Sequence, residues 1–219
     1  MDGGPDFREI YRALLARFGP QGWWPGETPL EVCLGAVLTQ STSWGNVERA
    51  LAALREATDL DFAKLRALSE GKLARLVRPA GFFRQKAERL KLLLDWLDGR
   101  CDGDFTRFDA IPTKDLRGEL LALRGIGPET ADSILLYALS RPVFVVDAYT
   151  RRVAHRHGWS DERAGYDELA ALFTTRLPRD PGVYNEFHAL FVRLGKEHCR
   201  KRNPRCHPCP LVGKMVYSS

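Results

Sequence analysis

Three cysteines near the end of the chain have a spacing that could hold a metal. Six residues separate Cys199 from Cys206, and two separate Cys206 from Cys209. The chain has five cysteines in all, an odd number that does not suit a set of disulfides. In a protein of the cytosol, a cysteine cluster points to a metal or redox site rather than to a disulfide framework. We therefore expect a metal centre in this segment.

A glycine turn and an aspartate form a second group that could do chemistry. Gly125 and Gly127 lie one residue apart, and Pro128 follows them. Glycines allow a tight hairpin and proline suits the first position of a helix, so this turn could present backbone N–H groups to a phosphate. Taken alone, the turn is more typical of an ordinary helix–helix connection. Asp147 follows the apolar residues 144–146 and opens another predicted helix, where it could be an N-cap or a reactive carboxylate.

The elements that must position these residues are helices. One apolar stripe, with spacings of three and four, predicts a helix from about residue 83 to 98. Its members are Phe83, Ala87, Leu90, Leu94 and Leu97. Similar stripes lie near residues 6–18, 30–40, 45–57, 113–122, 129–140, 147–157, 165–175 and 184–197. Asp61 and Ser69 are predicted N-caps of two short helices, and no alternating strand pattern is longer than Val143–Val146.

This pattern predicts an all-α fold with a central helical bundle and a second lobe made from both chain ends. Residues 30–122 form the predicted bundle, including part of the approach to the hairpin. Residues 123–198 carry the hairpin and the helix that follows Asp147, and they pack with the N-terminal segment. The cysteine loop and tail occupy residues 199–219. Sequence alone does not separate residues 1–29 from residues 113–219.

The composition indicates a folded chain with a localised positive charge. A length of 219 residues, 44% of them hydrophobic, can bury a substantial core. No apolar run approaches the ~20 residues that span a bilayer, and the N-terminus has no secretion signal, so we expect a cytoplasmic protein. Residues 196–219 alone carry the net charge of +5, because the remainder balances to zero. Such a tail suits contact with a polyanion, although it could simply be solvated.

Taken together, these motifs resemble the helix-hairpin-helix DNA glycosylases of the endonuclease III family. The resemblance combines the glycine turn, the aspartate after two valines and the cysteine cluster, and it runs from about Glu31 to Cys209. It implies a two-lobed helical glycosylase fold with a helix-hairpin-helix motif and a C-terminal iron–sulfur loop. It also implies a monomeric enzyme that binds double-stranded DNA and hydrolyses the N-glycosidic bond of a flipped, damaged base.

The resemblance assigns roles one residue at a time. The essential aspartate of the family falls on Asp147, where it would stabilise positive charge on the sugar and help orient a water. Gln40 matches the glutamine that fills the gap left by the base, and Phe82 matches the residue that wedges the opposite strand. Alternatively, Gln40 caps a helix and Phe82 belongs to the core. The expected phosphate contacts are Gly125 and Gly127 in the hairpin, with Arg200, Lys201 and Arg202 near the C-terminus.

One position departs from the bifunctional members of the family. They have a lysine where this chain has Glu129, and that lysine forms a Schiff base with the sugar before the strand is cut. A glutamate cannot form an imine. The enzyme is therefore expected to be monofunctional, with AP-lyase activity absent or weak.

Tryptophans give the indication of substrate. Trp23, Trp24 and Trp44 flank the predicted helix that leads to Gln40. Aromatic faces suit an extruded base, and cation–π attraction favours a positively charged alkylated purine. These residues resemble the 3-methyladenine branch of the family, which also lacks the lyase lysine. The alternative is that the tryptophans pack between the two lobes.

The cysteine spacing matches the first three ligands of the [4Fe–4S] loop in this family. The fourth position falls on Met215, whose neutral thioether is a poor substitute for a thiolate. Zinc is the competing metal, with His198 or His207 as the fourth ligand, although zinc ribbons usually have two C-x2-C pairs. Cys33, in an apolar run, is expected in the core, and Cys101 is expected in a loop.

Two other functions remain open. An enzyme of the same fold could take oxidised pyrimidines, the usual substrates of endonuclease III. A helix-hairpin-helix module could also bind DNA after losing its activity, as Glu129 and Met215 would allow. Asp147 argues against that loss, because it occupies the position that a glycosylase needs most.

Overall fold

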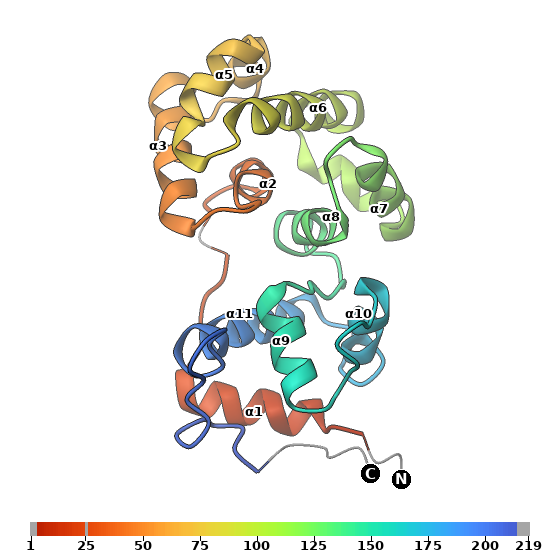
Figure 1. The fold of residues 1–219 in the computed structure, drawn as a ribbon. Helices are drawn as coiled ribbons and strands as arrows, with labels where there is room; N and C mark the ends of the chain where they lie inside the picture. The colour runs from red at the N-terminus through yellow and green to blue at the C-terminus, as the bar shows by residue number, and fades with distance from the viewer. Residues whose placement is uncertain (1–3, 25, 214–219) are drawn as a thin grey trace. The chain divides into compact units, whose positions relative to one another are not determined.

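In a computed structural model, which describes residues 4–24 and 26–213, the regular secondary structure is helical and the described part contains no strand (Figure 1). The segment Val143–Val146 has no regular secondary structure. The α-helices are α1 (Phe7–Phe18), α2 (Pro29–Leu38), α3 (Trp44–Thr58), α4 (Phe62–Ala67), α5 (Glu70–Leu76), α6 (Phe83–Cys101), α7 (Thr113–Ala122), α8 (Pro128–Ser133), α9 (Ala148–Arg156), α10 (Tyr166–Thr174) and α11 (Pro181–Glu197). Shorter helical turns are η1 (Arg78–Ala80), η2 (Phe105–Ala110) and the π-helical η3 (Ile134–Ala138). The prediction of an all-α fold is confirmed.

Local sequence explains where many of these helices begin. Asp61 and Ser69 cap α4 and α5 as predicted, because their side chains accept hydrogen bonds from backbone N–H groups of the first turn. Proline occupies the first turn of α2, α8 and α11, where a missing N–H costs little.

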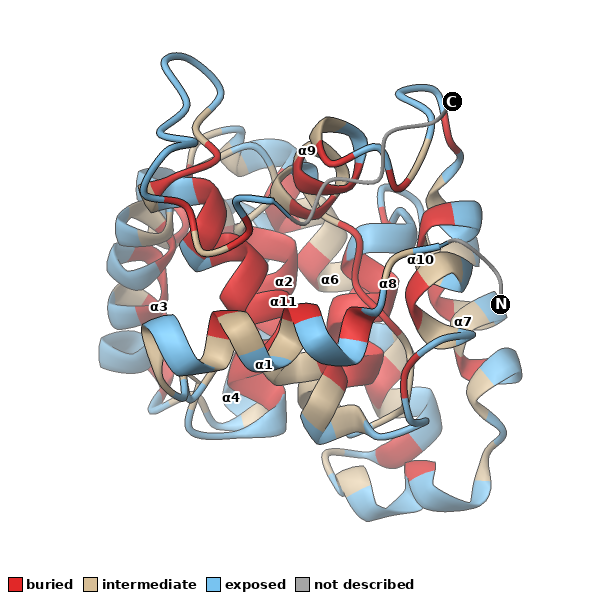
Figure 2. Ribbon diagram, turned by 90° about the horizontal axis from the view of Figure 1, so that it is seen from below, coloured by how far each residue is buried: buried red, intermediate tan, exposed pale blue. Residues whose placement is uncertain are grey.

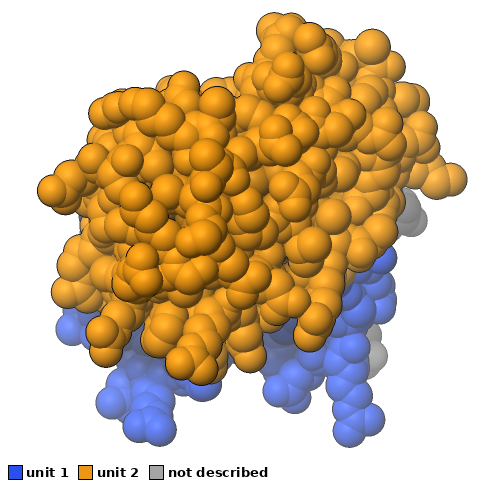
Figure 3. Space-filling view, turned by 90° about the horizontal axis from the view of Figure 1, so that it is seen from above, with its two compact units in different colours: residues 1–24, 142–219 blue, residues 25–141 orange. Residues whose placement is uncertain are grey.

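The chain divides into two compact units (Figure 3). Unit 1 combines both chain ends, residues 1–24 and 142–219, and unit 2 contains residues 25–141. The bundle predicted from the sequence ends at residue 122, whereas unit 2 continues through the hairpin and α8. The physical reason is that α8 and η3 pack against α2.

Unit 2 is built around α2 and α6. Nine of the ten residues of α2 are buried (Figure 2), and the buried Glu31 among them pairs with Arg55 at 2.6 Å. Helix α6 turns its predicted stripe inward, since every member except Phe83 is fully buried. Cys101 is the last residue of α6 and is buried, so its predicted place in a loop is wrong. Burial raises the pKa of its thiol, as it does for Cys33 in α2.

Unit 1 has an aromatic core between α1, α10, α11 and the non-helical segment before α9. The rings of Phe144 and Phe173 stack 4.3 Å apart, and those of Phe187 and Phe191 stack 4.5 Å apart. Phe7 from α1 joins them, 4.6 Å from Phe173. These contacts fix the non-helical segment that ends at Val146, and with it the start of α9.

Within the described ranges, no helix is long and apolar enough to cross a membrane.

Candidate active site

Asp147 is the N-cap of α9 in unit 1. Its Oδ1 atom accepts a hydrogen bond of 2.7 Å from the backbone N–H of Thr150. The preceding Val146 is buried, and its N–H donates to the hydroxyl of Tyr166 at 3.2 Å. Capping therefore uses one carboxylate oxygen of Asp147, and the side chain remains 13% exposed. The other oxygen is available for a second interaction.

That second interaction is with a histidine from α11. Nε2 of His188 lies 3.6 Å from Oδ2 of Asp147, and the His188 side chain is buried. Burial alone raises the pKa of the Asp147 carboxyl, but the charge and contact of His188, with hydrogen bonding from Thr150, hold that pKa below its ordinary value. Asp147 is therefore a carboxylate at neutral pH, as stabilisation of a developing positive charge requires.

Gln40 lies beyond the end of α2 in unit 2, and its side chain is tied to the hairpin. Its Nε2 donates to the carbonyl of Gly125 at 3.0 Å and to Oγ1 of Thr130 at 2.9 Å. Its Oε1 accepts a hydrogen bond from the Arg89 guanidinium. These bonds hold the amide beside the hairpin, and none of the three is to a group of α2.

Phe82 is not a core residue. It is 63% exposed and stands between η1 and α6 with φ of 44°, a left-handed backbone that bulky side chains rarely adopt. Gly81 before it also has positive φ, 70°. The two residues form a sharp turn that projects a large apolar ring into solvent, and a backbone strained in this way at a bulky residue is a feature found at functional sites.

The two glycines of the hairpin occupy positions that place different demands on the residue. Gly125 has φ of 84°, and a Cβ there would lie 2.3 Å from Nε of Arg89, so both the backbone and the close approach need glycine. A Cβ at Gly127 would meet nothing within 4 Å. Packing of unit 2 therefore does not explain Gly127, which is exposed and caps the start of α8.

Glu129 is exposed in the first turn of α8. An acidic side chain there suits the positive end of the helix dipole. The position carries a carboxylate rather than an amine, so it supplies no nucleophile for an imine.

The three tryptophans fall into different units and each is half-buried. Trp44 opens α3 in unit 2, and its Nε1 donates to Glu48 at 3.0 Å. Trp23 and Trp24 belong to unit 1, where their rings meet edge to face at 5.9 Å. The ammonium of Lys196 lies 5.9 Å from the Trp23 ring, so this ring already attracts a cation.

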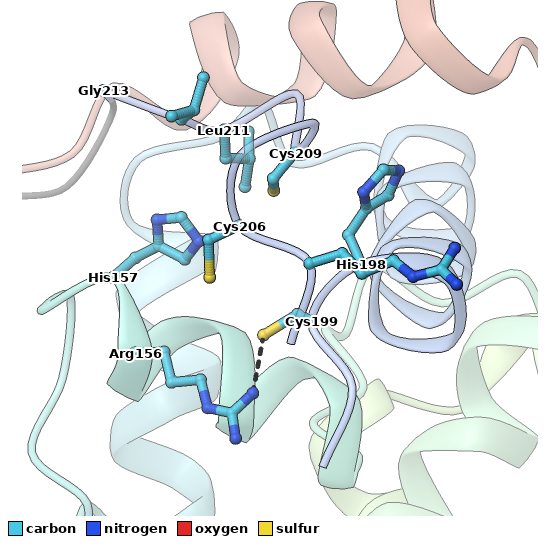
Figure 4. Close-up of a pocket in the computed structure, with 10 residues that line it drawn as sticks. Arg156, His157, His198, Cys199, Cys206, Cys209, Leu211 and Gly213 are labelled. Carbon is cyan, nitrogen blue, oxygen red and sulfur yellow. Dashed lines mark hydrogen bonds between the residues drawn. The ribbon is translucent and has the colours of Figure 1, made fainter. Parts of the chain in front are cut away.

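Cys199, Cys206 and Cys209 line one cavity of about 300 Å³ in unit 1 (Figure 4). Cys199 and Cys209 are buried and Cys206 is exposed. Burial raises the pKa of Cys209, and the two neighbouring thiols raise it further. His157, His198 and Leu211 complete much of the lining.

The three thiols of this cavity are of the residue type that binds either zinc or an iron–sulfur cluster. In the part of the chain that the structure describes, no three His, Cys, Asp or Glu side chains converge closely enough to hold one metal ion. Zinc with His198 or His207 as fourth ligand needs such convergence. A cluster would be held by thiolates at its corners, and the three cysteines that line this cavity are the residues that could supply them. The fourth family position, Met215, lies outside the described residues.

Two arginines of α9 that the sequence did not single out hold the cysteine loop. Arg152 donates to the carbonyl of Cys199 at 2.7 Å. Arg156 donates to the carbonyl of Arg200 at 2.6 Å and to the sulfur of Cys199 at 3.6 Å (Figure 4). Their spacing of four residues on one helix was the available signal.

Of the three basic residues near the C-terminus that are expected to contact phosphate, one is partly covered by the rest of unit 1. Arg200 is half-buried, and its Nε donates to the carbonyl of Lys196 at 3.3 Å. Lys201 and Arg202 are exposed. His188, Arg89 and the buried Lys86 were also missed, because no local pattern links them to the residues that they contact.

The helical fold, the glycine hairpin and the capped aspartate define a DNA base-excision repair glycosylase. The chain belongs to the family described as "HhH-GPD superfamily base excision DNA repair protein", whose model matches residues 34–179, about two thirds of the chain. Membership of the helix-hairpin-helix glycosylases, predicted from the motifs, is confirmed.

Individual relatives agree with this assignment. The chain is 48% identical over 206 residues to MJ1434 of Methanocaldococcus jannaschii, whose name gives DNA repair glycosylase as an inferred activity; the match covers 93% of this chain and 92% of MJ1434. It is 30% identical to endonuclease III of Thermotoga maritima, covering 93% and 89% of the two chains.

Solved structures give the same fold. The 3-methyladenine DNA glycosylase MagIII of H. pylori, bound to 1,N6-ethenoadenine, has a TM-score of 0.75 at 32% identity, with 88% of this chain and 98% of that chain covered. A non-covalent endonuclease III–DNA complex has a TM-score of 0.79 at 22% identity, with 95% and 93% covered. At that identity the second likeness concerns the fold alone.

Proposed function

We propose that this glycosylase is monofunctional and that it removes alkylated purines such as 3-methyladenine from double-stranded DNA. The observation that carries the first part is Glu129, which occupies the place where a lyase needs a lysine. Without that amine, water must attack the sugar. The protein is proposed to act as a monomer.

Asp147 is the proposed catalytic residue. Its carboxylate is ionised, oriented by Thr150 and still partly exposed. As the glycosidic bond breaks, positive charge develops on the sugar, and a fixed carboxylate stabilises that charge without having to reorganise. The same carboxylate can accept a hydrogen bond from the attacking water and orient it.

Gln40 and Phe82 are proposed to keep the base out of the duplex. The exposed ring of Phe82 would wedge between bases of the opposite strand, and the amide of Gln40 would occupy the gap. In this hypothesis Gly125 and Gly127 receive a phosphate of the same DNA, with Lys201, Arg202 and the partly covered Arg200 as further contacts.

The substrate proposal has two supports. Trp44 lies in the unit of Gln40, and Trp23 and Trp24 lie in the unit of Asp147; such rings favour a cationic, alkylated base. MagIII, a 3-methyladenine DNA glycosylase, is 32% identical to this chain. The second candidate is excision of oxidised pyrimidines, favoured by the relatives named endonuclease III.

Cys199, Cys206 and Cys209 are proposed to hold three corners of a [4Fe–4S] cluster, with Met215 at the fourth family position. The cluster would order the loop rather than take part in the chemistry at the base. The loop has few apolar side chains, so the free energy of metal binding would supply much of the free energy of folding for this segment. Arg152 and Arg156 would fix the same loop from α9.

Duplexes that each carry one defined lesion test the function directly. After incubation, alkali cuts every abasic site, so strand breakage reports base release. We expect 3-methyladenine to be released faster than thymine glycol. Faster release of thymine glycol would favour the second candidate, and no release of any base would favour a DNA-binding module without activity.

A further inference from the structure

Lys86 of α6 is a buried lysine in unit 2, with 1% of its surface exposed. A buried ammonium is costly unless it is hydrogen-bonded or paired. Among the residues that the structure describes, no carboxylate forms an ion pair with it. Its partners are two backbone carbonyls instead: Nζ donates to Leu38 at 2.8 Å and to Ala80 at 2.7 Å.

These two carbonyls come from separate parts of the chain but have the same local setting. Leu38 is the last residue of α2, and Ala80 is the last residue of η1. Carbonyls at the end of a helix lack partners within the helix and attract a cation. Gln40 follows Leu38 by two residues, and Phe82 follows Ala80 by two residues.

Helix α6 makes a second contact with the segment that carries Gln40. Arg89, three residues after Lys86, donates to Oε1 of Gln40 and lies against Gly125. Burial and the nearby charge of Arg89 lower the pKa of Lys86 to about 8, so the ammonium is still mostly protonated at neutral pH. Helix α6 therefore fixes the backbone before Gln40 through Lys86 and its side chain through Arg89.

We propose that Lys86 is a positioning residue that holds the segments carrying Gln40 and Phe82 at one separation, so that both side chains enter the duplex together. This inference rests on the proposed roles of Gln40 and Phe82. One ammonium joins two segments that are not otherwise neighbours in sequence. Losing it would leave both segments folded but would let their spacing vary.

The chain offers a matched control on the same helix. Lys91 of α6 also bonds two carbonyls, Arg66 at 2.7 Å and Leu68 at 3.3 Å, at the end of α4. Lys91→Met removes the same chemistry from a place remote in sequence from Gln40 and Phe82. A general loss of stability would appear in both methionine variants, whereas loss of positioning would appear only in Lys86→Met.

The experiment uses duplex DNA with 2-aminopurine beside the lesion, since its fluorescence rises when the duplex is opened. With saturating enzyme, we expect Lys86→Met to lower this rise and to slow single-turnover excision about tenfold or more, while Lys91→Met changes neither. We also expect Gln40→Ala and Phe82→Ala to slow excision by a smaller factor in the Lys86→Met background than in the wild type, because the effects of residues that act as a unit are not additive.

The outcomes separate the inference from its premise. If Gln40→Ala and Phe82→Ala leave excision and fluorescence unchanged, the proposed roles fail whatever Lys86 does. If they slow excision but a folded Lys86→Met keeps wild-type fluorescence and rate, the positioning role is overturned. Should Lys86→Met not fold, Lys86→Gln is the second variant: its side chain is shorter than that of lysine and carries no charge, so it should hold the two carbonyls less firmly, and we expect a smaller but measurable loss of fluorescence and rate. Wild-type fluorescence and rate in folded Lys86→Gln, with Gln40→Ala and Phe82→Ala slowing excision as much as they do in the wild type, would overturn the role.

Discussion

The imidazole of His188 lies 3.6 Å from the carboxylate of Asp147, across the contact between α11 and α9 in unit 1. Thr150 orients one oxygen of that carboxylate, and His188 faces the other. The pair keeps a partly buried acid ionised, although burial alone would favour its neutral form.

Replacing His188 should therefore move the pH dependence of excision. Because the pKa of Asp147 is lowered in the folded protein, the active carboxylate persists as the pH falls and is lost only below that pKa. Burial raises the pKa of Asp147, and in His188→Gln the imidazole no longer opposes that rise. The pKa of Asp147 therefore rises, and the acidic limb of the single-turnover rate moves to higher pH. His155→Gln, an exposed histidine of α9, is the control. Superimposable acidic limbs for wild type and His188→Gln would contradict the pairing.

Asp147→Asn should remove excision while leaving the fold intact. Asparagine is as good an N-cap as aspartate, so α9 should keep its start and the melting temperature should change little. Loss of the carboxylate should slow single-turnover excision by ~10²–10³-fold, with DNA affinity roughly unchanged. Near-normal turnover in this variant would reject Asp147 as the catalytic residue.

Borohydride should fail to trap the enzyme on DNA, because Glu129 supplies no amine for a Schiff base. Strand cleavage should then appear only after alkali is added to the finished reaction. The measurement is a denaturing gel of labelled duplex with and without borohydride. A strong adduct band would mean that another amine serves, and the enzyme could not be called monofunctional.

Trp44→Ala should slow release of 3-methyladenine about tenfold or more, since stacking of a base on an aromatic ring contributes ~1–3 kcal/mol. Trp44→Phe keeps an aromatic face but loses the hydrogen bond to Glu48, so it separates stacking from anchoring. We expect Phe to retain most of the rate. Equal loss in both variants would assign the effect to the Glu48 contact instead.

The purified protein should be brown, with the broad visible absorption of iron bound to thiolates. Cys199→Ser should lower iron content, disorder the basic loop, weaken DNA binding and flatten its dependence on salt. Cys33→Ser, which changes a core cysteine, is the control for a general loss of folding. Colourless, folded protein with stoichiometric zinc would reject the cluster, and folded protein without metal would show that the loop needs none.

Much of the fold follows from local sequence, for a physical reason. Helix formation depends on residues three and four apart and on caps beside them, so the stripe of α6 and the caps Asp61 and Ser69 can be found without tertiary information. Asp147 belongs with them, because an aspartate at a helix start is a local signal. The motifs around it were sufficient to predict the family.

Only the tertiary structure decided which distant groups meet these residues. Nothing near Asp147 in the sequence predicts His188, and nothing near Gln40 or Phe82 predicts Lys86, because packing of separate helices brings them together. Cys101 has the composition of a loop around it, yet it is the last residue of a long helix and is buried by the packing of unit 2. The exposure of Phe82 likewise depends on a left-handed turn, whose cost the rest of unit 2 must offset.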